Sequence, residues 1–167
     1  ARYISEEAPD LSWMYLEYSD DMGHGFGNSP EMIDGVKKAD IQIGRVWEAI
    51  QYREETFGED WLIVITTDHG RTDDGFDHGG HSARERATWI VTNSKNTNSH
   101  FEETPEMVDI LPSIANHLEL SIPKKIAMEL DGTPFIGTVD ASGLKAESKN
   151  GEISMTWKSL STGEKGR

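Results

Sequence analysis

The sequence predicts an α/β fold with a mostly parallel sheet and helices on its faces. Two short apolar runs, residues 61–66 (WLIVIT) and 87–92 (ATWIVT), predict strands that are buried on both faces, because such strands need no polar side. Segments with helical spacing of apolar residues occur before and after these runs. Strands that alternate with helices are typical of α/β sheets, which bind ligands at the carboxyl ends of their strands.

The first third of the chain predicts a strand, a loop and a long helix. Residues 11–18 (LSWMYLEY) are aromatic and apolar and predict a strand, and the loop SDDMGHGFGNS follows. Ser29, Pro30 and Glu31 form a helix start, with a capping hydroxyl, a proline at the first helical position and an acid in the first turn. Apolar residues then keep helical spacing to about Phe57, which predicts a long amphipathic helix.

The last third predicts a second helical segment and then a change of character. Thr104-Pro105-Glu106 is another helix start, and Pro112 inside the following pattern predicts a kink or two short helices. Residues 151–160 (GEISMTWKSL) alternate apolar and polar side chains, which predicts a half-buried antiparallel strand. We therefore expect an α/β part over residues 1–138 and a β-rich extension over 139–167 that would open a second domain.

Composition limits the partners. The formal net charge is −14, which opposes binding to duplex nucleic acid or to an anionic membrane surface. The chain has no cysteine, so disulfides and thiolate metal sites are excluded. No apolar run approaches the roughly 20 residues of a membrane span. The chain starts without Met and stops just after a strand-like run, so we expect a fragment that lacks material at both ends.

Carboxylates and imidazoles gather after the predicted strands, and together they suit zinc, with manganese or iron as alternatives. An Asp-x-x-x-His pair alone is mostly chance, and HGGHS alone could be a flexible loop. Their combination after consecutive strands favours a metal site. The candidate ligands are Asp20, His24, Asp68, His69, His78 and His81, whereas His100 and His117 are taken as solvated.

The order of these motifs resembles the C-terminal half of the alkaline phosphatase superfamily, in particular the type I phosphodiesterase/nucleotide pyrophosphatase family. YLEYSDDMGHGFG is similar to the strand and Asp-x-x-x-His segment of that family, and ITTDHG to its Asp-His segment. Residues 107–137 resemble the part that closes the domain in bacterial members. The resemblance implies that residues 1–138 are the C-terminal part of an alkaline phosphatase-like catalytic domain.

The resemblance implies two divalent metal ions, usually zinc. It implies that Asp20, His24 and a later histidine bind one ion, and that Asp68 and His69 bind the other. For the later histidine we choose His81, because Ser82 and then a strand follow it as in the family; His78 is the alternative ligand.

The resemblance also implies two-metal phosphoryl transfer to a Thr or Ser nucleophile, acting on a small phosphate ester. That nucleophile would lie upstream of this chain, so the expected catalytic residues here are none, and the fragment alone would be inactive. Sulfatases and phosphomonoesterases share the scaffold, and a non-catalytic metal-binding or structural module is the rival interpretation. We further expect self-association through the truncated face and a periplasmic or extracellular location in a bacterium.

Overall fold

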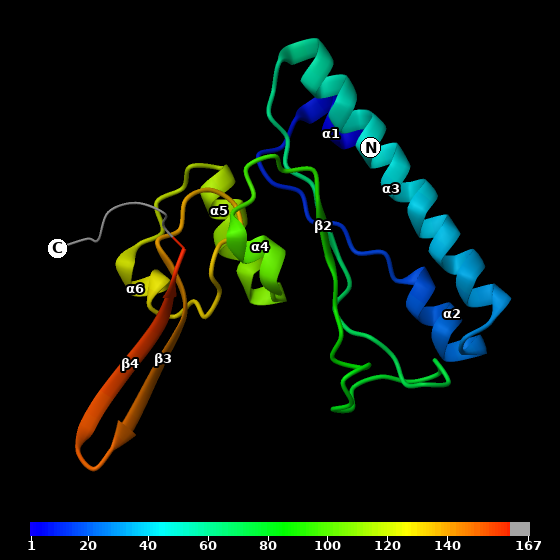
Figure 1. The fold of residues 1–167 in the computed structure, drawn as a ribbon. Helices are drawn as coiled ribbons and strands as arrows, with labels where there is room; N and C mark the ends of the chain where they lie inside the picture. The colour runs from blue at the N-terminus through cyan, green and yellow to red at the C-terminus, as the bar shows by residue number, and fades with distance from the viewer. Residues whose placement is uncertain (161–167) are drawn as a thin grey trace. The chain divides into compact units, whose positions relative to one another are not determined.

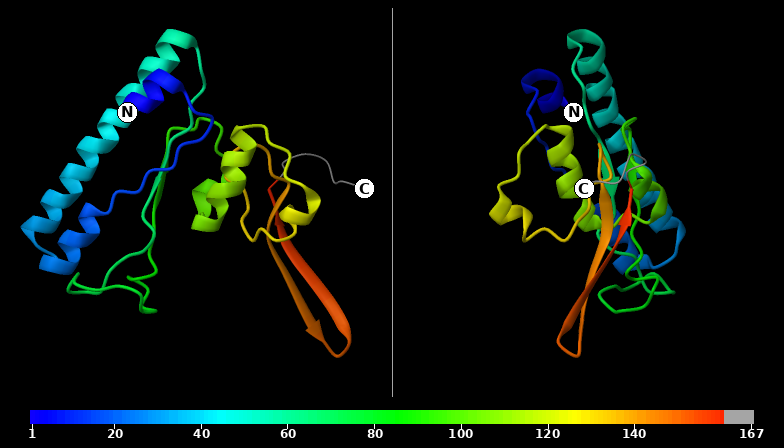
Figure 2. Two further views of the ribbon diagram at one scale, coloured as in Figure 1. Left: turned by 180° about the vertical axis from the view of Figure 1, so that it is seen from behind. Right: turned by 60° about the vertical axis from the view of Figure 1, so that its left-hand side comes forward.

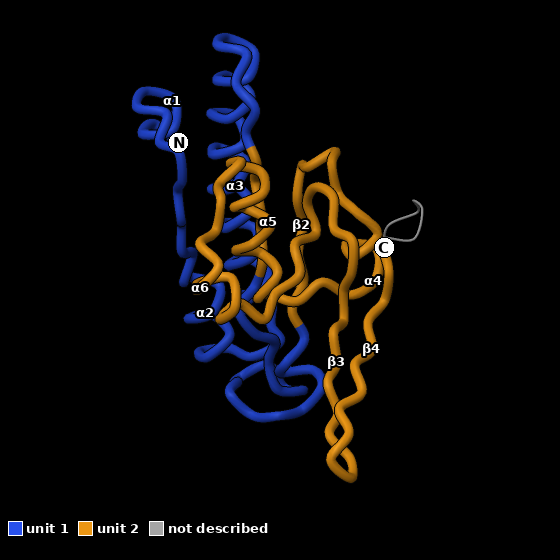
Figure 3. Tube along the Cα trace, turned by 90° about the vertical axis from the view of Figure 1, so that its left-hand side faces the viewer, with its two compact units in different colours: residues 1–61, 67–87 blue, residues 62–66, 88–167 orange. Residues whose placement is uncertain are grey.

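The computed structural model describes residues 1–160 of the chain. Contacts within the chain divide it into two units, which Figure 3 colours separately. The first unit comprises residues 1–61 and 67–87, and the second comprises residues 62–66 and the chain from residue 88 onward. The described residues form helices and two small antiparallel sheets, which is compatible with part of an α/β domain.

The long helix of the first unit confirms the prediction from the sequence. It is α3, Pro30–Phe57, and Figure 1 shows it as the longest helix. The Ser29 side chain caps it by accepting a hydrogen bond of 3.3 Å from the backbone N–H of Met32, and Pro30 takes the first position. The helix ends at Phe57, and the next residue, Gly58, has a left-handed φ of 68° that is easy only for a residue without a side chain.

Two short helices, α1 (Arg2–Glu7) and α2 (Tyr18–Phe26), pack on α3. The views in Figure 1 and Figure 2 agree that α1 lies beside the later half of α3 and α2 beside its start. Burial of apolar area drives the α1 contact, in which the buried side chains are Ile4, Val46, Ala49 and Ile50. The α2 contact is close at Gly35, where a Cβ atom would lie 3.2 Å from the Met22 side chain.

An ion pair between the buried Arg53 and the partly exposed Glu59 connects the end of α3 to the loop that follows. Arg53 is 9% exposed and donates from Nε to Glu59 at 2.9 Å, and from Nη1 to the Ser5 carbonyl at 3.2 Å. Trp61 Nε1 also donates to Glu59, at 2.7 Å. The Arg53 guanidinium and then the indole stabilise the carboxylate, which lowers the pKa of Glu59 to about 2.

The prediction of a strand over residues 11–18 is wrong for the described residues. Residues 11–17 form neither helix nor strand, and α2 begins at Tyr18. A strand needs a neighbour to accept its backbone hydrogen bonds, and within the described residues no strand pairs with this segment. The loop expected after it is largely helix α2, because its packing on α3 outweighs the low helix propensity of its glycines.

The two predicted strands of the second unit are present but shorter and not parallel. They are β1 (Val64–Thr66) and β2 (Ile90–Thr92), paired antiparallel with Ile65 opposite Val91. A parallel pair needs a crossover that carries the chain to the other end of the sheet, usually through a helix. Residues 67–89 contain no helix and bring the chain back to the same end, so the described strands cannot be parallel.

The helical part of the second unit contains α4 (Ser99–Glu103), the 3-10 turn η1 (Met107–Asp109), α5 (Ile110–His117) and α6 (Lys124–Ala127). The sequence predicts a kink or two short helices at Pro112, but the break lies earlier, since the 3-10 turn η1 ends at Asp109 and α5 continues through Pro112. Pro112 sits in the first turn of α5, where its missing N–H has no intrahelical partner to lose. Phe135 is fully buried, and its N–H donates to Ser113 Oγ at 2.8 Å.

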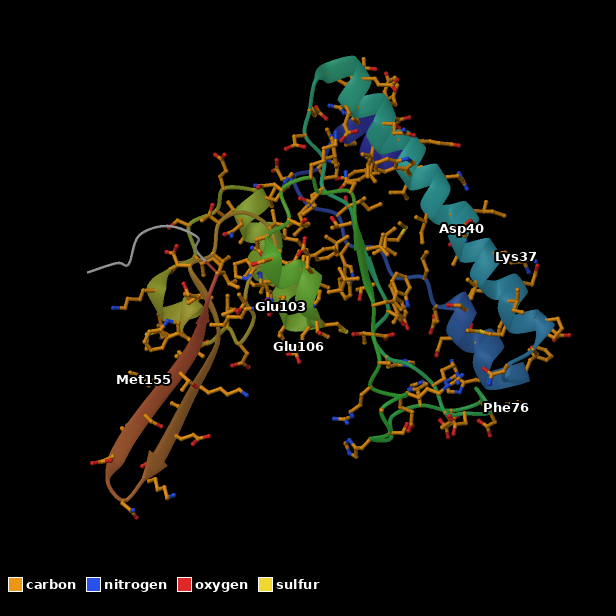
Figure 4. All side chains as sticks on the ribbon, in the orientation of Figure 1. Lys37, Asp40, Phe76, Glu103, Glu106 and Met155 are labelled. Atoms are coloured by element: carbon orange, nitrogen blue, oxygen red, sulfur yellow. The ribbon has the colours of Figure 1, made fainter. Side chains whose placement is uncertain are left out.

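A hairpin, β3 (Ala141–Lys149) and β4 (Glu152–Ser159), confirms the antiparallel strand predicted at the C-terminal end. Asn150 and Gly151 connect the strands with φ values of 54° and 82°, as a tight hairpin turn with the native twist requires. The expected half-burial is wrong: the apolar side chains of β4 are exposed, among them Met155 at 60%, which Figure 4 labels. The division at residue 138 stays a prediction.

His100 corrects another expectation, since it is not solvated. Its side chain is 15% exposed, and Nε2 donates to the buried carboxylate of Asp109 at 2.9 Å. Asp109 also accepts hydrogen bonds from the N–H groups of Glu106 and Thr133, so it joins three segments of the second unit.

None of the helices in residues 1–160 combines the length and apolar composition of a membrane-spanning helix.

Candidate metal centre

All of the predicted metal ligands lie in the first unit, on α2 and on the segment 67–87. Asp20 and His24 are four residues apart on α2, so their side chains share one face of the helix. Asp20 Oδ2 is 3.4 Å from His24 Nε2. The Asp-x-x-x-His spacing therefore produces a convergent pair of ligands because the segment is helical and not a loop.

Gly70 fixes the path of the chain next to His69. Its N–H donates to the Glu85 carbonyl at 2.8 Å, which ties the start of the segment to its end. A Cβ atom at residue 70 would lie 1.9 Å from the Arg84 carbonyl oxygen, a backbone atom that cannot move aside cheaply. The glycine after Asp68 and His69 is thus required by the close approach of two backbone segments.

The turn at residues 72–77 carries His78 to α2. It is closed by the N–H of Thr72, which donates to the Asp77 carbonyl at 2.9 Å. Asn28, just after α2, holds the turn by donating from Nδ2 to the Asp73 carbonyl at 2.7 Å. The hydroxyl of Thr72 donates to Asp74, and this bond lowers the pKa of the Asp74 carboxyl. The turn is thus a hydrogen-bonded structure that fixes where His78 begins.

The donor atoms of Asp20, His69 and His78 all lie within 4.8 Å of one another. Asp20 Oδ1 is 4.0 Å from His69 Nε2 and 3.7 Å from His78 Nε2. The rings of His69 and His78 stack with centroids 3.7 Å apart. Ligand atoms around a tetrahedral zinc, at about 2.05 Å from the ion, are about 3.4 Å apart, so this group needs only small shifts to enclose such an ion.

His24 lies beside this group and contacts two of its members, His78 and Asp20. Its Nε2 lies 3.0 Å from His78 Nε2, while its Nδ1 donates to the Phe76 carbonyl at 2.8 Å. Figure 4 labels Phe76 on the loop next to α2. His69 likewise donates from Nδ1 to the Gly70 carbonyl at 2.8 Å. Each of these hydrogen bonds assigns the ring proton to Nδ1 and leaves the Nε2 lone pair toward the group, as metal-binding histidines require.

Two predicted ligands, Asp68 and His81, are exposed and are not part of this group. Asp68 Oδ1 is 3.6 Å from His69 Nε2, but the Asp68 side chain is 60% exposed. His81 is exposed and stands outside the group formed by the described residues. Its loop is held by Glu85, which accepts from the N–H groups of Gly80 at 2.8 Å and Ser82 at 3.3 Å. Hydrogen bonds from the Ser82 hydroxyl and then from these backbone groups lower the pKa of Glu85.

Arg71 is a member of the site that the sequence analysis missed. Its side chain is 12% exposed and forms an ion pair with the Asp20 carboxylate. The signal was its position, directly after the Asp-His-Gly motif and within an acidic segment. The donor set of one carboxylate and three imidazoles, with two imidazoles oriented by backbone carbonyls, fits a divalent transition metal.

Comparison with protein families gives a match that covers most of the chain. The model of the type I phosphodiesterase / nucleotide pyrophosphatase family matches residues 1–127, a range that includes every residue of the candidate metal centre. Searches of the curated proteins and of the solved structures gave no significant match. Because the family model covers more than half of the 167 residues, the chain belongs to the type I phosphodiesterase / nucleotide pyrophosphatase family.

Proposed function

We propose that this chain carries the metal centre of a metal-dependent hydrolase of small phosphate esters, of the phosphodiesterase and nucleotide pyrophosphatase type. The observation that carries the proposal is the convergence of Asp20, His69 and His78 within 4.8 Å, in a chain of this family. A structural cluster of polar side chains would not need two imidazoles, His24 and His69, whose Nδ1 atoms donate to backbone carbonyls and whose Nε2 atoms lie 3.4 Å and 4.0 Å from the Asp20 carboxylate.

In this proposal the parent protein holds two divalent ions, most simply zinc. Asp20, His24 and His78 bind one ion, and Asp68 and His69 contribute to the other. We propose His78 in place of His81 because His78 Nε2 is 3.0 Å from His24 Nε2 and 3.7 Å from Asp20 Oδ1. A single ion bound by Asp20, His69 and His78 is the other arrangement that these distances allow, and metal stoichiometry distinguishes the two.

Divalent ions in such a site supply Lewis-acid stabilisation of the charge that develops on phosphoryl oxygens. The residues of this chain hold the ligand atoms in place and keep the imidazoles in the tautomer that can bind a cation. The nearby hydroxyls of Thr67 and Thr72 donate to the His69 carbonyl and to Asp74. The family pattern places a nucleophilic Thr or Ser upstream of the Asp-x-x-x-His segment, so we propose that the nucleophile comes from a part of the parent protein outside these 167 residues.

The test combines metal content with binding of a phosphate ester. Elemental mass spectrometry on the chain purified without chelator is compared with an Asp20→Ala, His24→Ala double variant. We expect about one zinc ion per chain, lost in the double variant, and about two in the longer parent protein, whereas one ion in both supports the single-ion arrangement. The zinc-loaded chain is then titrated with bis-p-nitrophenyl phosphate, p-nitrophenyl phosphate and p-nitrophenyl sulfate, and hydrolysis by the longer parent protein is measured with the same three compounds.

Each result separates the proposal from its rivals. Zinc-dependent binding and hydrolysis of the diester supports a phosphodiesterase, whereas preference for the monoester or the sulfate ester indicates the phosphomonoesterase or sulfatase branch. If zinc binds but the chain binds none of the three esters and the longer parent protein hydrolyses none of them, the result supports the non-catalytic metal-binding module. Absence of zinc from both the chain and the parent contradicts the proposal.

A further inference from the structure

Arg71 joins the two segments that supply the metal ligands. Its Nη2 forms an ion pair with Asp20 Oδ1 and donates to the Asp20 carbonyl at 2.8 Å, so it is bound twice to α2. Its Nη1 donates to the Gly75 carbonyl at 2.9 Å, in the turn that leads to His78. One planar guanidinium thus connects the helix that carries Asp20 and His24 with the turn that places His78.

The guanidinium reaches Asp20 across a glycine of α2. Gly23 is buried, and a Cβ atom there would lie 2.3 Å from Arg71 Cζ and 2.5 Å from Arg71 Nε. Real Cβ atoms do not approach other atoms so closely, so the path of Arg71 exists only because residue 23 has no side chain. Gly25, two residues later in the same helix, has nothing within 4 Å of its Cβ position. The two glycines of α2 therefore differ in what they do.

Arg71 contacts the oxygen of Asp20 that faces the other ligands. Oδ1 is 4.0 Å from His69 Nε2 and 3.7 Å from His78 Nε2, while Oδ2 lies toward His24. A carboxylate oxygen has two lone pairs, so Oδ1 can accept from the guanidinium with one and face a cation with the other. The pair with Arg71 thus restricts rotation of the carboxylate and leaves both oxygens directed at imidazoles.

We propose that Arg71 is a positioning residue of the metal centre, which orients the Asp20 carboxylate and holds the turn before His78, and that Gly23 is the residue that admits it. The inference rests on the proposed function, because it assumes that Asp20 binds a metal ion. The inference predicts the direction in which Arg71 changes the metal affinity. By charge alone, a guanidinium next to the site repels a second cation and weakens its binding. A positioning role requires the opposite, tighter metal binding with Arg71 than without it.

The experiment measures zinc affinity of the chain by competition with a chromophoric chelator. Loss of a partner that orients a metal ligand typically lowers affinity 10- to 100-fold, so we expect about that loss for Arg71→Ala. Arg71→Lys keeps the charge but has no second arm, and we expect an intermediate affinity. Gly23→Ala leaves every charge in place and should weaken binding through displacement of Arg71, whereas Gly25→Ala, the matched control, should not change it.

Far-UV circular dichroism and thermal melts on every variant show whether the fold persists. The expected result is weaker zinc binding in both Arg71→Ala and Gly23→Ala, with a double variant no weaker than the single Arg71 variant. Unchanged or tighter binding in Arg71→Ala overturns the positioning role, and so does a Gly23→Ala variant that behaves like Gly25→Ala. If the unsubstituted chain binds no zinc, both the inference and the metal centre fail. If the unsubstituted chain binds zinc and Arg71→Ala binds it equally well, the inference alone is overturned.

Discussion

The Nε2 atoms of His24 and His78 lie 3.0 Å apart, although 54 positions separate the two residues in the chain. A second contact supports the first, because His24 donates from Nδ1 to the carbonyl of Phe76, two residues before His78. One imidazole is thus fixed to the loop that supplies the other. With its proton on Nδ1, His24 presents the Nε2 lone pair to His78, where it can accept the Nε2 proton of His78 or bind a cation.

Substitution of His78 tests which histidine completes the site. His78→Ala removes a donor atom that lies 3.7 Å from Asp20 Oδ1, so we expect zinc affinity to fall by more than about 100-fold, the upper limit for loss of an indirect partner. His81→Ala is the matched control, because His81 is exposed on the same segment and outside the group. The measurement is chelator competition. A large loss in His81→Ala together with normal binding in His78→Ala would restore the assignment favoured by the family pattern.

Glu59 gives the first unit a defined sensitivity to acid. Its pKa is lowered from 4.5 to about 2, mainly by Arg53 and then by Trp61. A carboxyl whose pKa is lower in the folded than in the unfolded state stabilises the fold above the unfolded pKa. We expect this contribution to be complete above about pH 4.5 and to disappear as the pH falls toward about 2. Urea unfolding of the chain between pH 6 and pH 2, about the span that contains this transition, measures it.

Glu59→Gln should flatten the acid-dependent part of the unfolding free energy in that range. Glu55→Gln is the control, since Glu55 is exposed on α3. Because the Glu59 side chain is 32% exposed, high salt should reduce the difference between Glu59→Gln and the parent. An equally steep loss of stability in the Glu59→Gln variant would show that other groups cause the acid sensitivity.

Ser113 is expected to be the most sensitive hydroxyl of the second unit. It has no exposed surface, donates to the Asp109 carbonyl at 2.6 Å and accepts from the N–H of Phe135 at 2.8 Å. Ser113→Ala leaves that N–H without a partner beside a fully buried ring, which typically costs about 1–3 kcal/mol. Urea unfolding followed by tryptophan fluorescence checks it, with the exposed Ser12→Ala as control. A loss no larger than in the control would contradict the role of this hydroxyl.

The apolar segment before α2 leads us to keep the prediction of self-association. Trp13 is 93% exposed and Tyr15 62% exposed, and exposed apolar side chains close together commonly mark an interface. We expect sedimentation equilibrium to show a concentration-dependent dimer, with a dissociation constant about tenfold higher in Trp13→Ser, because loss of an indole contact removes about 1.4 kcal/mol or more. A parent chain that stays monomeric at all concentrations, or a variant that dimerises equally, would contradict it.

Local features of the fold could be predicted from the sequence wherever one segment carries the whole signal. The Ser29-Pro30-Glu31 start and the apolar spacing after it identify α3 without reference to any other segment. The alternation in β4 likewise identifies a strand, and the Asn150-Gly151 pair, which we overlooked, is the local signal for its hairpin. In the site, the same holds for the residue types, since carboxylate and imidazole at α2 and after β1 indicate a metal.

The features that we predicted wrongly depend on segments distant in sequence. The aromatic residues 11–17 suit a strand, but pairing requires a neighbour that the described chain does not supply. The glycines before α3 indicate a loop, but packing at Gly35 makes the segment a helix, and only then do Asp20 and His24 share a face. His100 lies in a polar segment, which predicts a solvated side chain. Its partner, Asp109, belongs to a different element, the 3-10 turn η1, so the segment of His100 alone does not reveal the contact.

The sequence by itself determined the family, the chemistry of the donor atoms and the elements with strong local signals, because spacing and side-chain type are properties of the chain alone. The tertiary structure decided which donors meet. His78 and not His81 lies beside Asp20, since the 72–77 turn docks on Asn28 while Glu85 holds the loop of His81. It also decided that Arg71 passes over Gly23 to reach Asp20. Such contacts depend on backbone hydrogen bonds between distant segments, and residue spacing along a chain does not encode them.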